Sequence, residues 1–214
     1  VNLIGDFGGG GMLLALGICA ALVEVAESER GQVIDAAMTD GSALLATMVH
    51  SFKAMGIWGD RGTNLLDTGA PFYDVFECAD GQYISIGSIE PQFYSELLRI
   101  IGLEKNGNLK QMDRANWAEM KSKISDSIRG KTRKEWEDLM EGTDVCFAPV
   151  LSIDEAYEHP HNKERQTFIE IAGTMQPAPA PRFSRTPSSV ASPPPHAGQH
   201  TDQVLIDLGL HHRS

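Results

Sequence analysis

The sequence predicts an α/β protein made of two modules and a long irregular return segment. Three observations support this prediction. A glycine-rich stretch leads into a long apolar segment, two strand-like runs flank an Asp-Gly pair, and eight of the eleven prolines lie from Pro160 onward. Long apolar segments favour helices, an Asp-Gly pair favours a β-hairpin, and clustered prolines exclude a continuous helix or central strand.

The stretch Gly5–Met12 places the carboxylate of Asp6 beside four consecutive glycines, just before an apolar segment at 12–25 that we expect to be a core helix. Glycine lets a ligand approach the backbone closely, and the first N–H groups of a helix lack partners within it. The pattern is therefore typical of a site that stabilises a carboxylate or an oxyanion. A helix cap at Asp6 with glycines as packing spacers is the alternative.

The remainder of the first module alternates in type. A β-branched run at 31–36 follows a glycine and predicts a strand. Apolar residues at helical spacing predict one long helix over about 39–55. Residues 56–69 are rich in Gly, Asp, Asn and Thr, which predicts a loop that leaves the module.

The second module begins with a hairpin formed by strands at 72–77 and 82–87. Pro91 suits the first turn of a helix that Gly102 ends. An amphipathic helix is predicted over 117–128. A strand-like run at 146–151 closes the module.

Two further helix starts carry a capping-box pattern, in which a Ser or Thr is followed three residues later by Glu. They begin at Thr132 and at Ser152. Beyond Pro160, the prolines from 176 to 195 predict a segment that wraps over another surface.

Composition describes a soluble globular protein with an acidic surface. Hydrophobic residues make up 42%, and 29 acidic residues against 18 Lys plus Arg give a net charge of −11. This charge repels polyanions, so we expect no nucleic-acid partner. The apolar segment 12–25 contains Glu24 and is too short to span a bilayer, so we expect no stable membrane anchoring.

The cysteines and histidines predict neither disulfides nor a metal site. Cys19, Cys78 and Cys146 are odd in number and widely spaced, which favours reduced thiols and a cytoplasmic location. The best-spaced histidine pair, His196 and His200, follows a proline-rich stretch that offers no helix to align two ligands.

Seven short motifs occur in order along essentially the whole chain. They lie at residues 5–10, 35–38, 64–67, 69–73, 79–81, 89–93 and 179–184. Together they resemble the class III CoA-transferase family, and within it the α-methylacyl-CoA racemases. The agreement in order and spacing is far more specific than any one motif.

The resemblance implies an interlocked homodimer whose subunits have two domains. The large domain has Rossmann-like α/β layers, of which only part is expected here, and the small domain is α+β. Residues 1–37 would be the remainder of the large domain, 38–70 a connector helix and loop, 71–151 the small domain, and 152–214 a return segment on the large domain. Because the chain opens on Val1, we expect it to be the C-terminal part of a longer protein.

The resemblance also implies a reaction, epimerisation of 2-methylacyl-CoA thioesters at the α-carbon. Removing the α-proton gives an enolate, and returning a proton to the opposite face requires a second acid/base group. Asp6 matches one such group of the family. The other is a His upstream of the motif, and none of the seven histidines here corresponds to it. Glu90 matches a Glu that reaches toward this His in the other subunit.

Six more residues are predicted to bind the acyl-CoA substrate: Asn2, Gly8, Gly9, Met12, Met38 and Ile89. Asn2 would hold Asp6 through its amide, and the methionines and Ile89 would line a pliable acyl surface. Core packing explains any single one of these as well. CoA enters as part of the substrate, so no cofactor is expected.

Two alternatives stay open. In a CoA-transferase of the same family, Asp6 would attack the thioester and form an acyl anhydride. In the other alternative, the chain is an inactive fragment that serves only as a dimerisation surface. Racemisation is favoured because Asp6 is followed by Phe7 and glycines, whereas the transferases tend to have polar residues there. Without the His, we expect this chain alone to be inactive.

Overall fold

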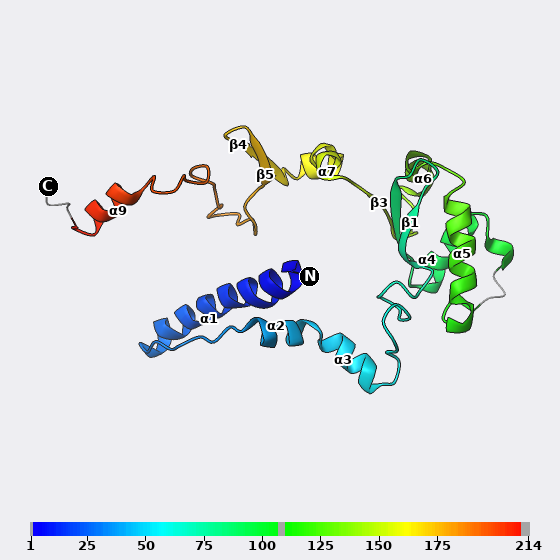
Figure 1. The fold of residues 1–214 in the computed structure, drawn as a ribbon, viewed down its shortest axis with the longest axis horizontal. Coiled ribbons are helices and arrows are strands. Elements are labelled where there is room, and N and C mark those ends of the chain that lie inside the picture. Colours follow the sequence, from blue (N-terminus) through cyan, green and yellow to red (C-terminus); the bar gives the residue numbers. More distant parts are fainter. Residues whose placement is uncertain (1, 107–109, 211–214) are drawn as a thin grey trace. The chain divides into compact units, whose positions relative to one another are not determined.

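The computed structural model describes residues 2–106 and 110–210 of the chain, and Figure 1 shows its ribbon coloured along the sequence. The chain divides into two compact units, Val1–Pro149 and Val150–Ser214. Helices and small antiparallel sheets together make up the fold. The predicted domain boundaries at residues 37, 70 and 151 stay predictions.

The first unit begins with one continuous helix (Figure 1). Its first ten residues, η1 (Leu3–Met12), form a π-helix, and α1 (Leu13–Ser28) continues it. The prediction that the glycines precede the helix is therefore wrong, since Asp6 lies inside it. Because glycines have no side chains, this turn can widen and pack its backbone directly against a neighbouring helix.

The helix also differs from the predicted core helix in its burial. It spans 26 residues with a mean hydropathy of 1.9 in its apolar window, of which 11% is buried, and α1 has no buried residue. The prediction of a core helix is wrong for this chain, and so is the argument that the segment is too short to cross a membrane. By length and composition alone, a helix that spans a membrane cannot be distinguished from a core helix that is covered by parts of a protein outside this chain.

The next segment departs from the predicted pattern twice. Residues 31–37 form neither helix nor strand, because the sheets of the described residues offer no neighbouring strand to take up their backbone hydrogen bonds. The predicted long helix is two helices, α2 (Met38–Leu45) and α3 (Thr47–Ala54). They meet at Ala46, and the Thr47 hydroxyl donates to the carbonyl of Leu44 (2.5 Å) at this junction.

The predicted hairpin is confirmed. β1 (Tyr73–Glu77) pairs antiparallel with β2 (Tyr83–Gly87), so that Tyr73 lies opposite Gly87. Gly81 takes a positive φ of 74° in the turn, which glycine adopts without strain. β3 (Phe147–Val150) lies beside β2 and completes a three-stranded sheet in the order β1-β2-β3.

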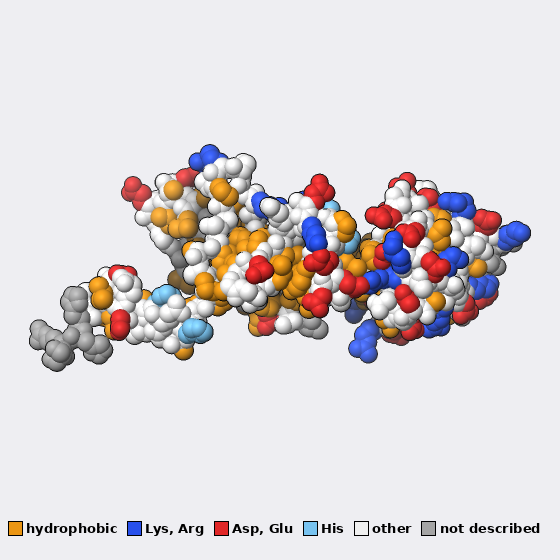
Figure 2. Space-filling model, turned by 90° about the horizontal axis from the view of Figure 1, so that it is seen from above, with side chains coloured by type: hydrophobic (Ala, Val, Ile, Leu, Met, Phe, Trp, Pro, Cys, Tyr) orange, Lys and Arg blue, Asp and Glu red, His pale blue; other side chains and the backbone are white. Residues whose placement is uncertain are grey.

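Three helices accompany this sheet: α4 (Pro91–Ile100), α5 (Trp117–Ile128) and α6 (Arg133–Met140). Short 3₁₀ helices occupy Glu104–Asn106 and Arg114–Asn116. The three predicted helices are confirmed, including Pro91 in the first turn of α4. Their buried side chains and the inner face of the hairpin form one core, which includes Phe72, Ile84, Leu97, Ile124 and Trp136. Lys, Arg, Asp and Glu side chains are interspersed on the surface of this part, on the right of Figure 2.

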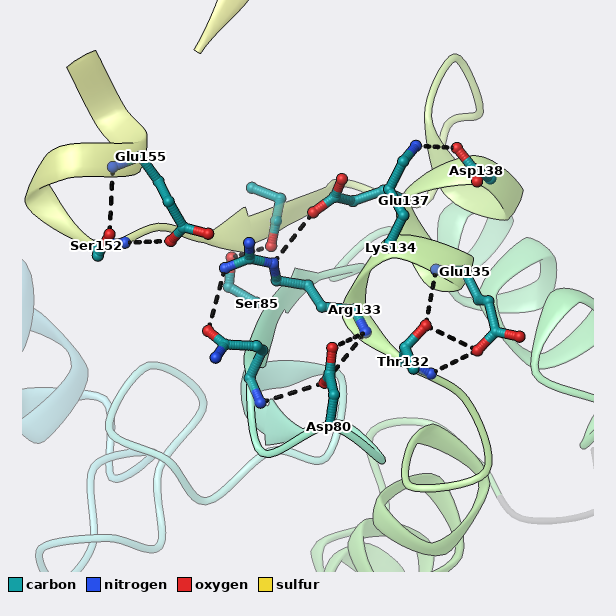
Figure 3. Close-up of polar contacts among 12 residues, drawn as sticks. Asp80, Ser85, Thr132, Arg133, Lys134, Glu135, Glu137, Asp138, Ser152 and Glu155 are labelled. Atoms are coloured by element: carbon teal, nitrogen blue, oxygen red, sulfur yellow. Dashed lines mark hydrogen bonds and ion pairs between the residues drawn. The ribbon is translucent and has the colours of Figure 1, made fainter. Parts of the chain in front are cut away.

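Both predicted capping boxes are confirmed (Figure 3). Thr132 Oγ1 accepts from the backbone N–H of Glu135 (3.3 Å), and Glu135 Oε2 accepts from the N–H of Thr132 (2.8 Å). Ser152 and Glu155 make the same reciprocal pair at 3.2 and 2.8 Å. Each box satisfies two N–H groups that a helix start would leave unpaired.

The second unit holds α7 (Ile153–Glu158), α8 (Pro160–Glu164) and α9 (Thr201–Asp207). It also holds an antiparallel hairpin that the sequence did not predict, formed by β4 (Phe168–Ile171) and β5 (Thr174–Pro177). Residues 178–200 form no helix or strand, as their prolines predict.

Candidate active site

Asp6 lies in the N-terminal part of η1 with its side chain exposed. Asn2 is the N-cap residue of η1, and its side chain makes no capping hydrogen bond. The side chains of Asn2 and Asp6 form no hydrogen bond with each other. The carboxylate of Asp6 is thus unpaired within the described residues and open to solvent.

The glycines of η1 pack on α2 through their backbone. A Cβ at Gly9 would lie 2.9 Å from the backbone nitrogen of Ser42, and a Cβ at Gly41 would lie 1.8 Å from the carbonyl oxygen of Gly9. A Cβ at Gly8 would only touch the Leu45 side chain at 3.4 Å. Gly9 and Gly41 therefore allow a helix contact that no side chain would permit.

The two predicted methionines differ in their contacts. Met38 starts α2, and its Cγ lies 2.9 Å from where a Cβ of Gly10 would stand, so it packs against η1. Met12 ends η1 and is 68% exposed. A groove of about 280 Å³ runs between this helix and α2. Of the predicted site residues, Gly9 lines it.

Ile89 and Glu90 lie in the loop between β2 and α4, on different elements from Asp6. Ile89 is half-buried and packs against the core. Glu90 is the N-cap residue of α4, but its side chain makes no capping hydrogen bond and is exposed. The usual explanation of an acidic residue at a helix start, that it caps the helix, does not apply to Glu90.

A hydrogen-bond network around Asn64 and Asp67 orders the loop between Gly59 and Gly69. This loop belongs to the predicted connector, and the sequence analysis did not predict the network. Asn64 is 1% exposed, accepts from the N–H of Gly59 (2.7 Å) and donates to Asp67 Oδ2 (2.7 Å). Asp67 also accepts from the N–H groups of Gly62 (2.9 Å) and Asn64 (2.6 Å). Burial opposes ionisation of Asp67, but its hydrogen bonds outweigh burial and lower the pKa of its carboxyl.

Two basic side chains attach the loop at 56–69 to the predicted small domain, residues 71–151. Lys121 donates to the carbonyl of Thr68 (2.6 Å) and pairs with Asp74. Arg114 donates to the carbonyl of Ile57 (2.6 Å) and lies over the ring of Trp117 at 5.4 Å. The motif at 64–67 pointed to the family, but it did not predict which residues the loop at 56–69 contacts.

A second groove, of about 380 Å³, lies beside the outer face of the hairpin. It contains none of the predicted site residues. Its lining includes Leu66, Thr68, Tyr73, Ser85 and Cys146. Burial, and then the negative charges of Glu90 and Asp144, raise the pKa of the Cys146 thiol, which lies on the rim of this groove.

The second unit has a groove of its own, of about 510 Å³, lined by β4 and by the proline-rich segment. Arg182 lines it and donates to the carbonyl of Gln166 (2.8 Å). Arg182 belongs to the motif at 179–184.

Among described residues, the structure brings Gly8, Gly9 and Met38 together at the contact of η1 with α2. No hydrogen bond within the described part of the chain joins Glu90 to Asp6.

Comparisons with known proteins give the same family for nearly the whole chain. Residues 2–201 match CoA-transferase family III. The alpha-methylacyl-CoA racemase of Mus musculus is 46% identical over 213 residues, which cover 98% of this chain and 56% of the relative. The human alpha-methylacyl-CoA racemase is 41% identical with the same coverage. The chain thus spans little more than half the length of these relatives.

Solved structures share the fold. A CAIB/BAIF family protein from Brucella suis has a TM-score of 0.72 at 20% identity and covers 94% of this chain and 54% of that one. The protein Rv3272 from M. tuberculosis has a TM-score of 0.69 at 22% identity and covers 89% and 50%. With the match over residues 2–201, these findings establish that the chain belongs to CoA-transferase family III.

Proposed function

We propose that the complete protein containing this chain epimerises 2-methylacyl-CoA thioesters at the α-carbon. The observation that carries the proposal is the identity of 46% and 41% to two alpha-methylacyl-CoA racemases across 98% of the chain. The carboxylate of Asp6, exposed on a glycine-rich helix and without a partner among the described residues, supports a role in proton transfer.

In the proposed mechanism, Asp6 takes the α-proton from one epimer and leaves an enolate. A His from outside this chain then donates a proton to the opposite face, and the roles reverse in the other direction.

The remaining site residues have supporting roles in this proposal. Gly8 lets the thioester approach the backbone, Gly9 seats the same helix against α2, and Asn2, Met12, Met38 and Ile89 contact the acyl-CoA. Glu90 acts across an interlocked homodimer, where its carboxylate faces the His of the other subunit and stabilises its charged form. The large domain has Rossmann-like layers that this chain contains in part, and the protein works in the cytoplasm without a cofactor.

A CoA-transferase reaction is the second candidate, because family III includes it and the same carboxylate could act as nucleophile. Asp6 would then form an acyl anhydride and release CoA, and the α-proton would stay in place. The fate of this proton separates the two reactions.

The test uses a chimaera in which the part of the mouse racemase that precedes its match to this chain is joined to this chain. One epimer of a 2-methylacyl-CoA is incubated with it in heavy water. We expect inversion with α-deuteration, and a loss of about a hundred- to ten-thousand-fold in Asp6→Asn. Glu24→Gln, which removes an exposed carboxylate from the same helix, is the control and should keep the full rate.

Transfer of CoA to an added acid without α-deuteration would contradict the racemase proposal in favour of the transferase. The chain without the added part should show no deuteration, because it lacks the His. Turnover by the isolated chain would show that this His is not needed.

A further inference from the structure

Gln111 binds the backbone immediately before Glu90. Its side-chain Nε2 donates to the carbonyl oxygens of Ser88 (3.1 Å) and Ile89 (2.8 Å). One amide group therefore holds two successive carbonyls of the loop that leads from β2 into α4. The contact is not local, since Gln111 lies more than 20 residues further along the chain.

Gln111 is in turn tied to the core. Its own carbonyl accepts from Nε1 of Trp117 (2.8 Å), and Trp117 is 6% exposed. The Trp117 ring meets Phe72 edge to face at 6.0 Å between centroids. The backbone of Gln111 is therefore anchored to a buried aromatic pair, and its partly buried side chain extends from this fixed point.

The other side of the same loop is fixed as well. Ser88 is fully buried, and its hydroxyl donates to the carbonyl of Val145. The N–H of Gly87 donates to the carbonyl of Cys146 (2.9 Å). The backbone of residues 87–89 is thus held between Gln111 and the segment that enters β3.

Within residues 2–106 and 110–210, no hydrogen bond or ion pair holds the side chain that follows. Glu90 occupies the N-cap position of α4 without capping it, whereas Asp113, Thr132 and Ser152 cap their helices with their side chains. A backbone fixed from two sides thus presents a free carboxylate to the outside. This arrangement suits a carboxylate that acts on a group beyond the chain's own fold.

We propose that Gln111 is a positioning residue for Glu90: by holding the carbonyls of Ser88 and Ile89, it fixes the direction in which the Glu90 carboxylate leaves the domain. The inference rests on the proposed function, in which Glu90 supports the catalytic His of a partner subunit. Gln111 itself touches no reacting atom.

The first test measures amide hydrogen exchange in this chain. Gln111→Met keeps the length of the side chain and removes both donors. We expect the amides of residues 87–90 to exchange about tenfold faster, as for the loss of one or two hydrogen bonds. Ser127→Ala is the matched control, since it removes another side-chain hydrogen bond to a backbone carbonyl, that of Ile101 (2.7 Å). It should leave exchange at 87–90 unchanged.

The second test measures inversion by the chimaera with Gln111→Met, Glu90→Gln and both together. Gln111→Met should lower kcat by about tenfold and raise KM by a smaller factor, because the loosened loop also carries Ile89, a proposed substrate contact. If Gln111 acts through Glu90, the double variant should be no slower than Glu90→Gln alone.

The outcomes are separable. Unchanged exchange at 87–90 in Gln111→Met overturns the inference whatever the activity, and so do losses that multiply in the double variant. A Glu90→Gln chimaera with the full inversion rate contradicts the role that the proposed function gives to Glu90, while the exchange data still decide whether Gln111 holds the loop.

Discussion

Gly9 and Gly41 bring two helices together at backbone distance. A Cβ at Gly41 would lie 1.8 Å from the carbonyl oxygen and 2.8 Å from the Cα of Gly9. No side-chain rotation can relieve such an overlap, because both atoms belong to the backbone. This contact seats the same π-helix that carries Asp6 against α2.

Gly41→Ala should therefore destabilise the chain, although alanine is the better helix former. Helix propensity favours Ala over Gly by about 1 kcal/mol, whereas forced overpacking costs about 1–3 kcal/mol, so the clash should prevail. The urea midpoint followed by circular dichroism measures the difference. Gly31→Ala is the control, because a Cβ there meets nothing within 4 Å. A midpoint that rises in Gly41→Ala would contradict the contact.

Asp67 should make the stability of the chain depend on acid. Its pKa is lower in the folded state than the ordinary value of 3.8, so its contribution is present above that value and is lost as the pH falls through the folded pKa. The urea midpoint should fall more steeply below the ordinary pKa of 3.8 in the wild type than in Asp67→Asn. Asp126→Asn, an exposed carboxylate on α5, should keep the wild-type slope. Equal slopes in all three proteins would rule out this role.

The three thiols should differ in reactivity. Cys19 and Cys146 are exposed, whereas Cys78 is buried, and burial together with Asp80 raises the pKa of Cys78 to about 11. Because the thiolate is the reactive form, an aromatic disulfide reagent should label two thiols of the folded chain and the third only after unfolding. Cys78→Ala should lower the count in the unfolded chain alone. Rapid labelling of three thiols in the folded wild type would contradict the buried position.

Thr132→Ala should remove the capping box at the start of α6. Loss of such a cap costs about 0.5–2 kcal/mol in the free energy of unfolding. Ser95→Ala removes an exposed hydroxyl that donates to the carbonyl of Pro91 within α4, and it should change stability by less than about 0.5 kcal/mol. If both substitutions lower the free energy of unfolding equally, the reciprocal hydrogen bonds of Thr132 and Glu135 add no more stability than a single exposed hydroxyl.

The sequence was most informative where structure is decided by neighbours along the chain. The Asp80-Gly81 turn, Pro91 in the first turn of α4 and both capping boxes are local signals, and the structure confirms the elements that they predicted. The predictions were wrong where a contact between residues far apart in sequence determines the structure. The glycines of η1 were predicted to precede the helix, because nothing near them in sequence indicates a contact with the backbone of Gly41.

Two other errors have similar causes. Residues 31–36 have the composition of a strand but no neighbouring strand among the described residues. The β4–β5 hairpin was missed because the prolines dominated the interpretation, although Phe168–Ile171 followed by Gly173 carried a usable signal. For the site, motifs singled out Asp6 and Glu90. No motif could reveal Gln111, since its importance lies in two carbonyls far away in sequence.

At the uncapped start of α4, the residue that would best stabilise the helix differs from the residue that the proposed function needs, which is Glu90. Replacing Glu90 by Ser, Asp or Asn would supply the missing cap and stabilise the helix by about 1 kcal/mol. A screen that rewards heat resistance alone would favour such replacements, and a shorter side chain could no longer extend beyond the domain. Variants selected in this way should gain thermal stability and lose racemase activity in the same step.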